Sequence, residues 1–242
     1  MLTDVTARTD EIEKKHGWAI TGISDTTISM SYRREIELVF DIGAFQQSQQ
    51  AKRGKSQPNS RIDLWYIAAS REHNPLPSTA EKDFFLQCIR DHVRGLPQST
   101  TKASHLLKVV SAAWDKANTV ANQVRFLNLT FLTTVTKTSD TSICVKASLV
   151  LIPLKTRVEV RVHLQSIATG QGVEVTVTPE ARVVYGEQFN VSKMTEFLSE
   201  KLGGQVIDRV QDQTQGKMST WSDAMLELHR KLLAKGQKAA QR

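Results

Sequence analysis

The stretch from Ser142 to Tyr185 constrains the fold most strongly, because apolar residues recur there at every second position. The alternation runs from Val145 to Leu151, from Val158 to Leu164 and from Val173 to Val177. A period of two is that of a β-strand, whose successive side chains point to opposite faces of a sheet. We therefore predict a three-stranded meander with one polar face and one apolar face, which helices must cover.

Turn residues separate the three runs of this meander. Pro153 is followed by Lys155 and Thr156, and the second break is the segment Ala168 to Gly172. Proline lacks the N–H that a sheet ladder needs, and glycine adopts the positive φ angles of tight turns. Both breaks therefore predict chain reversals between antiparallel strands.

The first half of the chain has a similar but less regular pattern. Trp18 to Ile23 predicts a short strand, and alternation from Ile28 to Ile42 predicts one long strand in which Arg34 marks a bulge or bend. Ile62 to Ala68 predicts a third strand. Residues 45–60, rich in Gln and Ser, are expected to form a disordered loop. This half is therefore predicted to hold a second three-stranded meander.

Apolar residues with a helical period predict four helices around these strands. Ser78 or Thr79 caps the first, and Asn190 or Ser192 caps the third. The four predicted helices cover residues 79–95, 101–125, 190–202 and 220–235, with a further helical segment between Val206 and Val210. Strands and helices thus occur in the same order in both halves, which predicts two tandem α+β domains.

The expected organisation follows from this order of elements. Residues 1–16 form a lead-in helix or the end of a coiled coil, residues 17–98 form the first domain, and residues 99–242 form the second domain with its C-terminal helix. The charged start of the chain is interpreted as the continuation of a preceding region. Neither a membrane-spanning run nor an apolar signal core is present, so we expect a soluble intracellular protein.

Charge and cysteine content bound the class of function. The 242 residues contain 32 Lys and Arg against 25 Asp and Glu, a net charge of +7. This excess is compatible with nucleic-acid binding, although much of it lies in Lys52 to Lys55 and in the tail from Arg230, where it more simply solvates the chain. Two cysteines far apart in sequence indicate neither a disulfide framework nor a zinc site.

The residues do not assemble a recognisable catalytic site. No phosphate-binding glycine loop, nucleophile elbow or metal-spaced histidine pair is present, so neither a cofactor nor an enzymatic activity is expected. His73-Asn74-Pro75 faintly resembles the His-Pro-Asn element of ubiquitin-conjugating enzymes, but with a different residue order. Cys88 lies on the apolar face of a predicted helix and is interpreted as a buried structural thiol.

Apolar residues outside the expected core phase are candidates for binding a partner. Trp65 and Ile67 lie on the second face of a predicted strand, as do Val150 and Ile152. On the last predicted helix a heptad-like spacing is shared by Trp221, Met225, Leu228 and Leu232. Core packing and a partner groove both explain this last set. The partner-binding candidates are therefore Trp221, Met225, Leu228, Leu232, Trp65 and Ile67.

Two segments resemble a known family. Gly17 to Ile20, preceded by the possible end of a coiled coil, and the strand Thr27 to Phe40 are similar to the C-terminal region of the fungal kinetochore-null (blinkin) scaffold of the outer kinetochore. That region consists of two RWD domains, which have a ubiquitin-conjugating-like α+β fold without its catalytic machinery. The Tyr-Pro-x-x-x-Pro motif of typical RWD domains is absent, and only Asn74 to Pro77 comes near it.

The resemblance implies tandem RWD-like domains, each an antiparallel β-meander flanked by helices, with an N-terminal coiled-coil remnant. It also implies a non-enzymatic module in the nucleus, at the kinetochore and centromere, that anchors the scaffold to the MIND complex for chromosome segregation in mitosis. A tail of a MIND subunit would lie in an RWD groove, and the preceding coiled coil would meet a Zwint-like partner. No membrane or direct nucleic-acid contact is implied. A basic nucleic-acid-binding α+β module remains the alternative, followed by an enzyme charged at Cys88.

Overall fold

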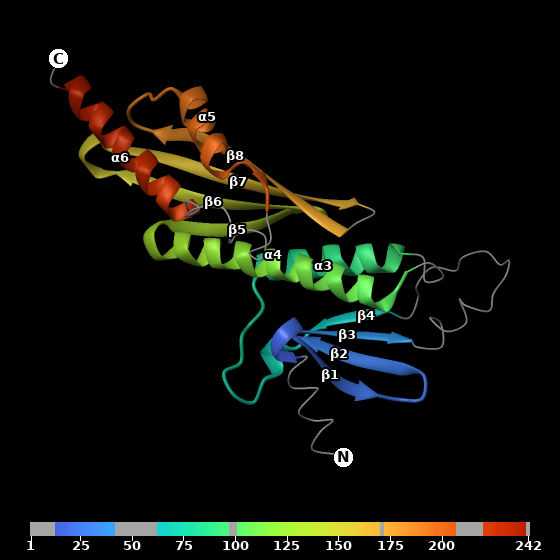
Figure 1. Cartoon of the computed structure of the whole chain (residues 1–242). Coiled ribbons are helices and arrows are strands. Elements are labelled where there is room, and N and C mark those ends of the chain that lie inside the picture. Colours follow the sequence, from blue (N-terminus) through green and yellow to red (C-terminus); the bar gives the residue numbers. More distant parts are fainter. Residues whose placement is uncertain (1–12, 42–61, 97–100, 170–171, 207–219, 241–242) are drawn as a thin grey trace. The chain divides into compact units, whose positions relative to one another are not determined.

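A computed structural model describes residues 13–41, 62–96, 101–169, 172–206 and 220–240 (Figure 1). The chain forms two compact units, one made of residues 1–79 and 86–112 and the other of residues 80–85 and 113–242. Helices α3 (Ala80–Gly95) and α4 (Ala103–Thr130) contribute residues to both units. The two units contain separate antiparallel sheets flanked by helices, so the α+β prediction is confirmed. The boundary between residues 98 and 99 stays a prediction.

The first unit contains a four-stranded sheet with strands in chain order. These strands are β1 (Trp18–Ile23), β2 (Thr27–Tyr32), β3 (Ile36–Asp41) and β4 (Asp63–Tyr66), and each neighbouring pair is antiparallel. The prediction of one long strand from Ile28 to Ile42 was wrong, because the chain reverses between β2 and β3. The predicted coiled coil and the 45–60 loop lie outside the described residues, except that residues 13–16 are helical.

Two adjacent arginines make the reversal between β2 and β3. Arg33 and Arg34 have φ angles of 49° and 56°, in the left-handed region, and Glu35 N donates to Tyr32 O at 2.9 Å. Consecutive positive φ angles match the twist of a hairpin, although glycine or asparagine usually supplies them. Arg71 stabilises this turn by donating to the Arg33 and Arg34 carbonyl oxygens at 3.2 and 3.0 Å. A residue 37 positions away thus holds a turn that the local sequence does not predict.

The apolar phase of the first sheet is buried. Ile36 and Leu38 have no exposed surface, and α3 supplies the equally buried Ile89. Arg90 on α3 donates Nε–H to the Leu64 carbonyl at 2.8 Å, so the helix is bonded to strand β4. The other buried apolar side chains of the strands are Trp18, Tyr32, Phe40 and Leu64.

The second unit contains a five-stranded antiparallel sheet in chain order. Its strands are β5 (Leu132–Ser139), β6 (Ser142–Leu151), β7 (Thr156–Thr169), β8 (Gly172–Tyr185) and the short β9 (Gly204–Gln205). The three-stranded meander is confirmed as β6–β8, and β5 and β9 extend it on both sides. Helix α4 ends at Thr130, five residues beyond the prediction. Most of the predicted helical segment after Val206 lies outside the described residues.

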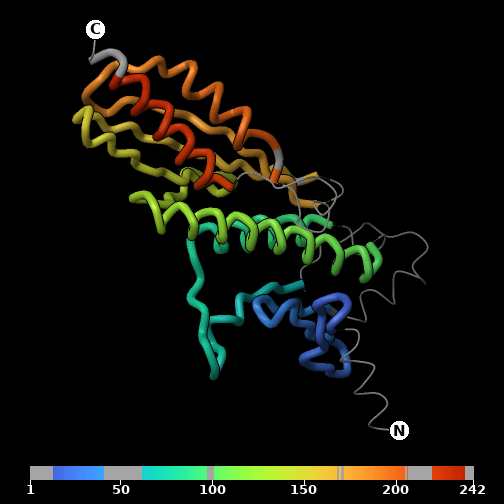
Figure 2. Tube along the Cα trace, turned by 60° about the vertical axis from the view of Figure 1, so that its left-hand side comes forward, coloured from blue at the N-terminus to red at the C-terminus, as the bar shows by residue number. Residues whose placement is uncertain are grey.

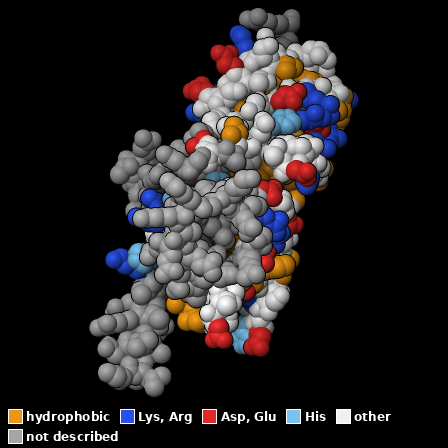
Figure 3. Space-filling model, turned by 90° about the vertical axis from the view of Figure 1, so that its right-hand side faces the viewer, with side chains coloured by type: hydrophobic (Ala, Val, Ile, Leu, Met, Phe, Trp, Pro, Cys, Tyr) orange, Lys and Arg blue, Asp and Glu red, His pale blue; other side chains and the backbone are white. Residues whose placement is uncertain are grey.

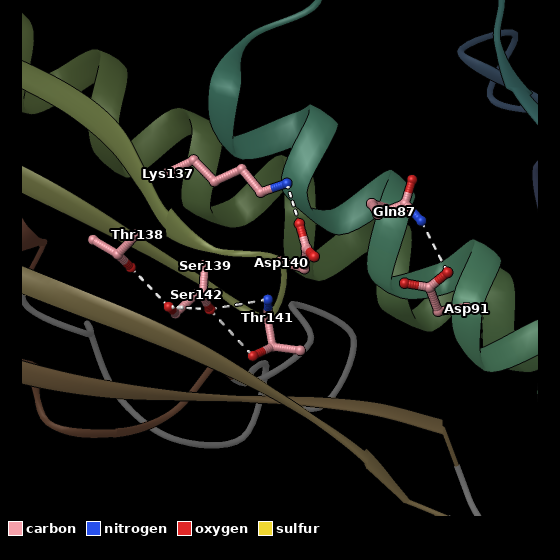
Figure 4. Close-up of polar contacts among 8 residues, drawn as sticks. All are labelled: Gln87, Asp91, Lys137, Thr138, Ser139, Asp140, Thr141 and Ser142. Atoms are coloured by element: carbon pink, nitrogen blue, oxygen red, sulfur yellow. Dashed lines mark hydrogen bonds and ion pairs between the residues drawn. The ribbon is translucent and has the colours of Figure 1, made fainter.

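The predicted turn at Pro153 joins β6 to β7, whereas residues 170 and 171 of the other predicted turn lie outside the described residues. Between β6 and β7, the 3-10 turn η2 (Ile152–Leu154) contains Pro153 and ends at Lys155, whose φ is 46°. The β5–β6 turn is held by side chains instead: Lys137 pairs with Asp140 at 2.6 Å, and Ser142 Oγ lies 2.7 Å from Thr138 Oγ1 (Figure 4).

Helices α5 (Val191–Leu202) and α6 (Trp221–Ala240) pack on the second sheet and against each other (Figure 2). Helix α5 contacts β8, and α6 contacts β6 and η2. Beneath them the inward strand residues are fully buried, and each buried Val or Leu side chain stabilises the fold by about 1.5–3 kcal/mol. The strand residues without exposed surface are Val145, Ala147, Leu149, Leu151, Val158, Val160, Val162, Leu164 and Val175.

Candidate functional site

The four candidates on the last helix form one stripe on α6, and all of them are buried. Trp221 and Met225 lie in the core, with Met225 fully enclosed. Leu228 and Leu232 are also buried, but they line a groove that opens between α5 and α6. The structure therefore places two of the four predicted residues where a partner could contact them.

The α5–α6 groove, as we call it, has an apolar floor and a basic rim. It encloses about 250 Å³, which is below the roughly 300–1,000 Å³ typical of small-molecule pockets. Its floor is buried and its rim exposed, and Phe197 is half-buried at its wall. The floor is Phe189, Met194, Leu228 and Leu232, and the rim is Asn190, Lys193, Lys231 and Lys235. This volume accommodates a few side chains of a protein segment.

Specific contacts fix α5 beside β8. Asn190 caps the helix, because its Oδ1 accepts a hydrogen bond from Lys193 N at 2.9 Å. Thr195 Oγ1 accepts from Ala181 N of β8 at 3.3 Å. The predicted cap is confirmed, and it places Lys193 in the first turn, at the groove.

Three contacts fix α6 on the opposite side of the groove. Trp221 N donates to Gln123 Oε1 of α4 at 3.0 Å, and a His229 ring nitrogen lies 3.2 Å from the Val150 carbonyl oxygen. Near the other end, Gly236 lies so close to Leu154 that an added Cβ would meet its side chain. The groove is therefore bounded by two helices of the second unit, and each of them is held by contacts with the rest of that unit.

Lys231 lies across the aromatic wall of the groove. Its Nζ is 4.1 Å from the centroid of the Phe197 ring and 2.8 Å from Glu227 Oε1, one helical turn earlier. A cation over an aromatic face is attracted by the ring quadrupole, and an i,i+4 ion pair adds a little more. The lysine holds down the pKa of Glu227 by hydrogen bonding to its carboxylate. Lys231 thus connects α6 to α5 over the ring.

The other two candidates belong to the first unit. Trp65, on β4, is 54% exposed, and the Arg90 guanidinium lies 5.6 Å from its ring centroid. Ile67, just after β4, is half-buried. These residues and the α6 stripe belong to different units. Their role in binding stays a prediction.

Sequence reasoning missed the part played by Phe197 and the three lysines. Phe197 falls on the apolar stripe of its helix, and Lys231 and Lys235 lie in the basic tail from Arg230, which was interpreted as solvated chain. Lys231 and Lys235 are four residues apart and therefore lie on one helical face. This spacing was the only sign of the basic rim in the sequence. The packing of α5 against α6 is needed to show that Lys193 lines the same groove as Lys231 and Lys235.

The outer face of the second sheet bears mixed charge. Arg161 and Arg182 both bond Glu159, and His163 lies 3.5 Å from Glu180. Figure 3 likewise shows basic and acidic side chains next to each other on the face that it presents. A nucleic-acid platform requires a continuous basic stripe with exposed aromatic residues. Nothing in the described surface favours that alternative.

Among the described residues, neither a reactive cysteine nor a metal-binding site is evident. Both Cys88 and Cys144 are buried, as predicted for Cys88, and burial raises the pKa of the Cys144 thiol. No group of three His, Cys, Asp or Glu side chains in the described ranges could hold a metal ion. None of the described helices is both long and apolar enough to cross a bilayer.

Comparison with known proteins identifies the first part of the chain. Residues 4–121 match the family model described as the Knl1 RWD C-terminal domain. The chain carries a Knl1-family C-terminal RWD region. No curated protein and no solved structure matches. The matched residues contain the segments Gly17–Ile20 and Thr27–Phe40, so the resemblance to the kinetochore-null family is confirmed there.

This family supplies a coarse function. Knl1-family RWD domains are non-catalytic interaction domains of a kinetochore scaffold, which places this chain among the proteins of chromosome segregation at the kinetochore. Its partners are accordingly other kinetochore proteins. The α5–α6 groove lies beyond residue 121 and so outside the matched part.

Proposed function

We propose that this chain is a non-enzymatic docking module that anchors an outer-kinetochore scaffold to the MIND complex. The single observation that carries the choice of site is the α5–α6 groove, a hollow with an apolar floor in a chain whose residues 4–121 match a family of interaction domains. Peptide segments recognised by protein domains commonly insert side chains into such grooves between helices. A tail of a MIND subunit is the segment that the kinetochore-null resemblance implies.

The groove offers two kinds of contact to such a tail. Leu228 and Leu232 present apolar surface at its floor, and Phe197 presents a half-buried ring at its wall. Aromatic side chains in partly enclosed sites often dominate binding energy. Trp221 and Met225 lie below this surface and support it. The lead-in region, of which residues 13–16 are helical, would serve a second, Zwint-like coiled-coil partner.

Replacement of Phe197 tests the proposal with the least risk to folding. We expect Phe197→Ala to weaken binding of the purified MIND complex about tenfold or more, measured by isothermal titration calorimetry. Leu232→Ala should act in the same direction, but it also creates a cavity in a buried site and lowers stability by about 2–5 kcal/mol. Circular dichroism melts of both variants separate lost folding from lost binding.

Leu233 provides a matched control on the same helix. Leu233 follows Leu232 in the sequence and is half-buried, but it does not line the groove. Leu233→Ala should therefore bind the MIND complex as the unmodified chain does. Full-strength binding by folded Phe197→Ala and Leu232→Ala would place the site elsewhere. Absence of any binding by the unmodified chain would refute the anchoring role itself.

A further inference from the structure

The rim of the α5–α6 groove has one sign of charge. Lys193 lies on α5 and Lys231 and Lys235 lie on α6, and none of the described residues that line the groove is acidic. Lys231 forms an ion pair with Glu227, whose Oε1 lies 2.8 Å from Lys231 Nζ. Lys193 and Lys235 are exposed and make no side-chain ion pair within the described residues. Two lysines on opposite walls therefore remain available to an anion.

The positions of these charges relative to the apolar floor restrict the occupant. Leu228, Leu232 and Met194 would be covered by apolar side chains, while the lysines would meet groups at the edge of the bound segment. Lys231 and Lys235 are one helical turn apart, a separation of about 6 Å along the axis. A segment with carboxylates on both sides of its apolar residues would complement this arrangement.

We propose that the α5–α6 groove binds an acidic amphipathic peptide segment, with apolar side chains on Leu228 and Leu232 and carboxylates on Lys193 and Lys235. This inference rests on the proposed docking function and adds the chemistry of the tail. Lys231 has a different part, because it already covers Phe197 and pairs with Glu227 in the free protein. Complementary charges at the edge of an interface raise the association rate and set the preferred partner.

Charge reversal at the two available lysines tests this chemistry. The variant Lys193→Glu/Lys235→Glu is compared with Lys201→Glu/Arg230→Glu, which reverses two exposed charges on the same helices outside the groove. Both variants change the net charge equally, so any long-range effect is matched. Binding of the purified MIND complex is measured by biolayer interferometry at low and high salt.

We expect the groove reversal to weaken binding about tenfold or more at low salt, with less than about a twofold change in the control. The difference should shrink at high salt, because the screening length falls from about 10 Å at 0.1 M to about 3 Å at 1 M. A model peptide with two leucines one helical turn apart and flanking glutamates should bind the unmodified chain, whereas its lysine-substituted counterpart should not.

The possible outcomes separate this inference from the proposed function. If the unmodified chain does not bind the MIND complex, anchoring itself fails. If Phe197→Ala weakens binding but the groove reversal behaves like its control, the groove is the site and its preference for acidic segments is refuted. Equal losses in both reversed variants would show a general charge effect and also refute it. Binding to phosphatidylserine vesicles is measured on the same variants. If the groove reversal loses vesicle binding while its MIND binding stays intact, the occupant of the groove is a lipid and the peptide assignment is overturned.

Discussion

Arg182 Nη2 on β8 lies 2.8 Å from Glu159 Oε1 on the neighbouring strand β7. Arg161 Nε approaches the same oxygen at 2.9 Å, so one carboxylate joins two cations on the outer face of the second sheet. Glu159 is only 3% exposed. Burial alone would raise its pKa, but hydrogen bonds from Arg161 and Arg182 outweigh that effect, and the pKa lies below its usual value.

Arg182→Ala should therefore lower the free energy of unfolding at neutral pH by about 1.5–3 kcal/mol, the range for hydrogen bonds to charged groups. The ionised carboxylate stabilises the fold above the ordinary glutamate pKa, and this contribution is lost as pH falls through the lowered folded pKa. The difference between variant and unmodified protein should accordingly shrink in acid, as measured by urea unfolding at pH 7 and below pH 4.5.

Lys146→Ala is the matched control for this prediction. Lys146 is half-buried on the same face of the sheet and pairs in register with Arg161, but it makes no ion pair with the described residues. Its removal should change stability little at either pH. An Arg182→Ala effect of equal size at pH 7 and in acid would show that packing, rather than charge, is what this arginine contributes.

His92 should make the stability of the first unit depend on pH near neutrality. Its Nε2 is buried without a hydrogen-bond partner among the described residues, and burial, followed by the charge of His105, lowers its pKa from 6.5. Because the folded pKa is depressed, stability is full above about pH 6.5 and declines as pH falls toward the lowered value. His92→Phe should flatten this decline in urea unfolding curves measured between about pH 7 and 5.

The control for His92 is the exposed His73, whose replacement by Gln should leave the decline unchanged. An equally steep loss of stability in His92→Phe would assign the pH dependence to other groups.

Gly186 allows the chain to leave β8. Its φ is +93°, and an added Cβ would lie 2.6 Å from Thr156 Cα and 2.7 Å from Lys155 O. Gly186→Ala should therefore lower the free energy of unfolding by at least about 1–3 kcal/mol, the cost of such a backbone conformation alone. Gly204 also has positive φ, at +115°, but has open space around it. If Gly204→Ala is as costly as Gly186→Ala in urea unfolding, the clash with Thr156 contributes nothing.

The second sheet was predictable because its alternation is long and its turns carry proline and glycine. The reversal between β2 and β3 was not, because Arg33 and Arg34 lack turn chemistry and their carbonyl oxygens accept hydrogen bonds from the distant Arg71. The α5–α6 groove was missed for a related reason. Leu228 and Leu232 follow a helical period that the sequence shows. Lys193 and Lys235 line the same groove only because α5 and α6, which are separated in sequence, pack against each other.

Trp65→Ala tests whether the first unit has a binding surface of its own. Because the ring is exposed and its contact with Arg90 is a cation–π interaction, the free energy of unfolding should change by at most about 1 kcal/mol. If Trp65 contacts the partner, MIND binding should fall about tenfold. Ile23→Ala, at a 71% exposed site on the same sheet, is the control and should bind normally.

Combining Trp65→Ala with Phe197→Ala then shows how the two surfaces act. Sites that act independently have additive free-energy effects, so the binding losses of the double variant should multiply if both surfaces contact the partner at once without influencing each other. Calorimetry on the two single variants and the double variant measures this directly. Unchanged binding by folded Trp65→Ala would remove Trp65 from the partner surface, but it would not affect the case for the α5–α6 groove, which belongs to the other unit.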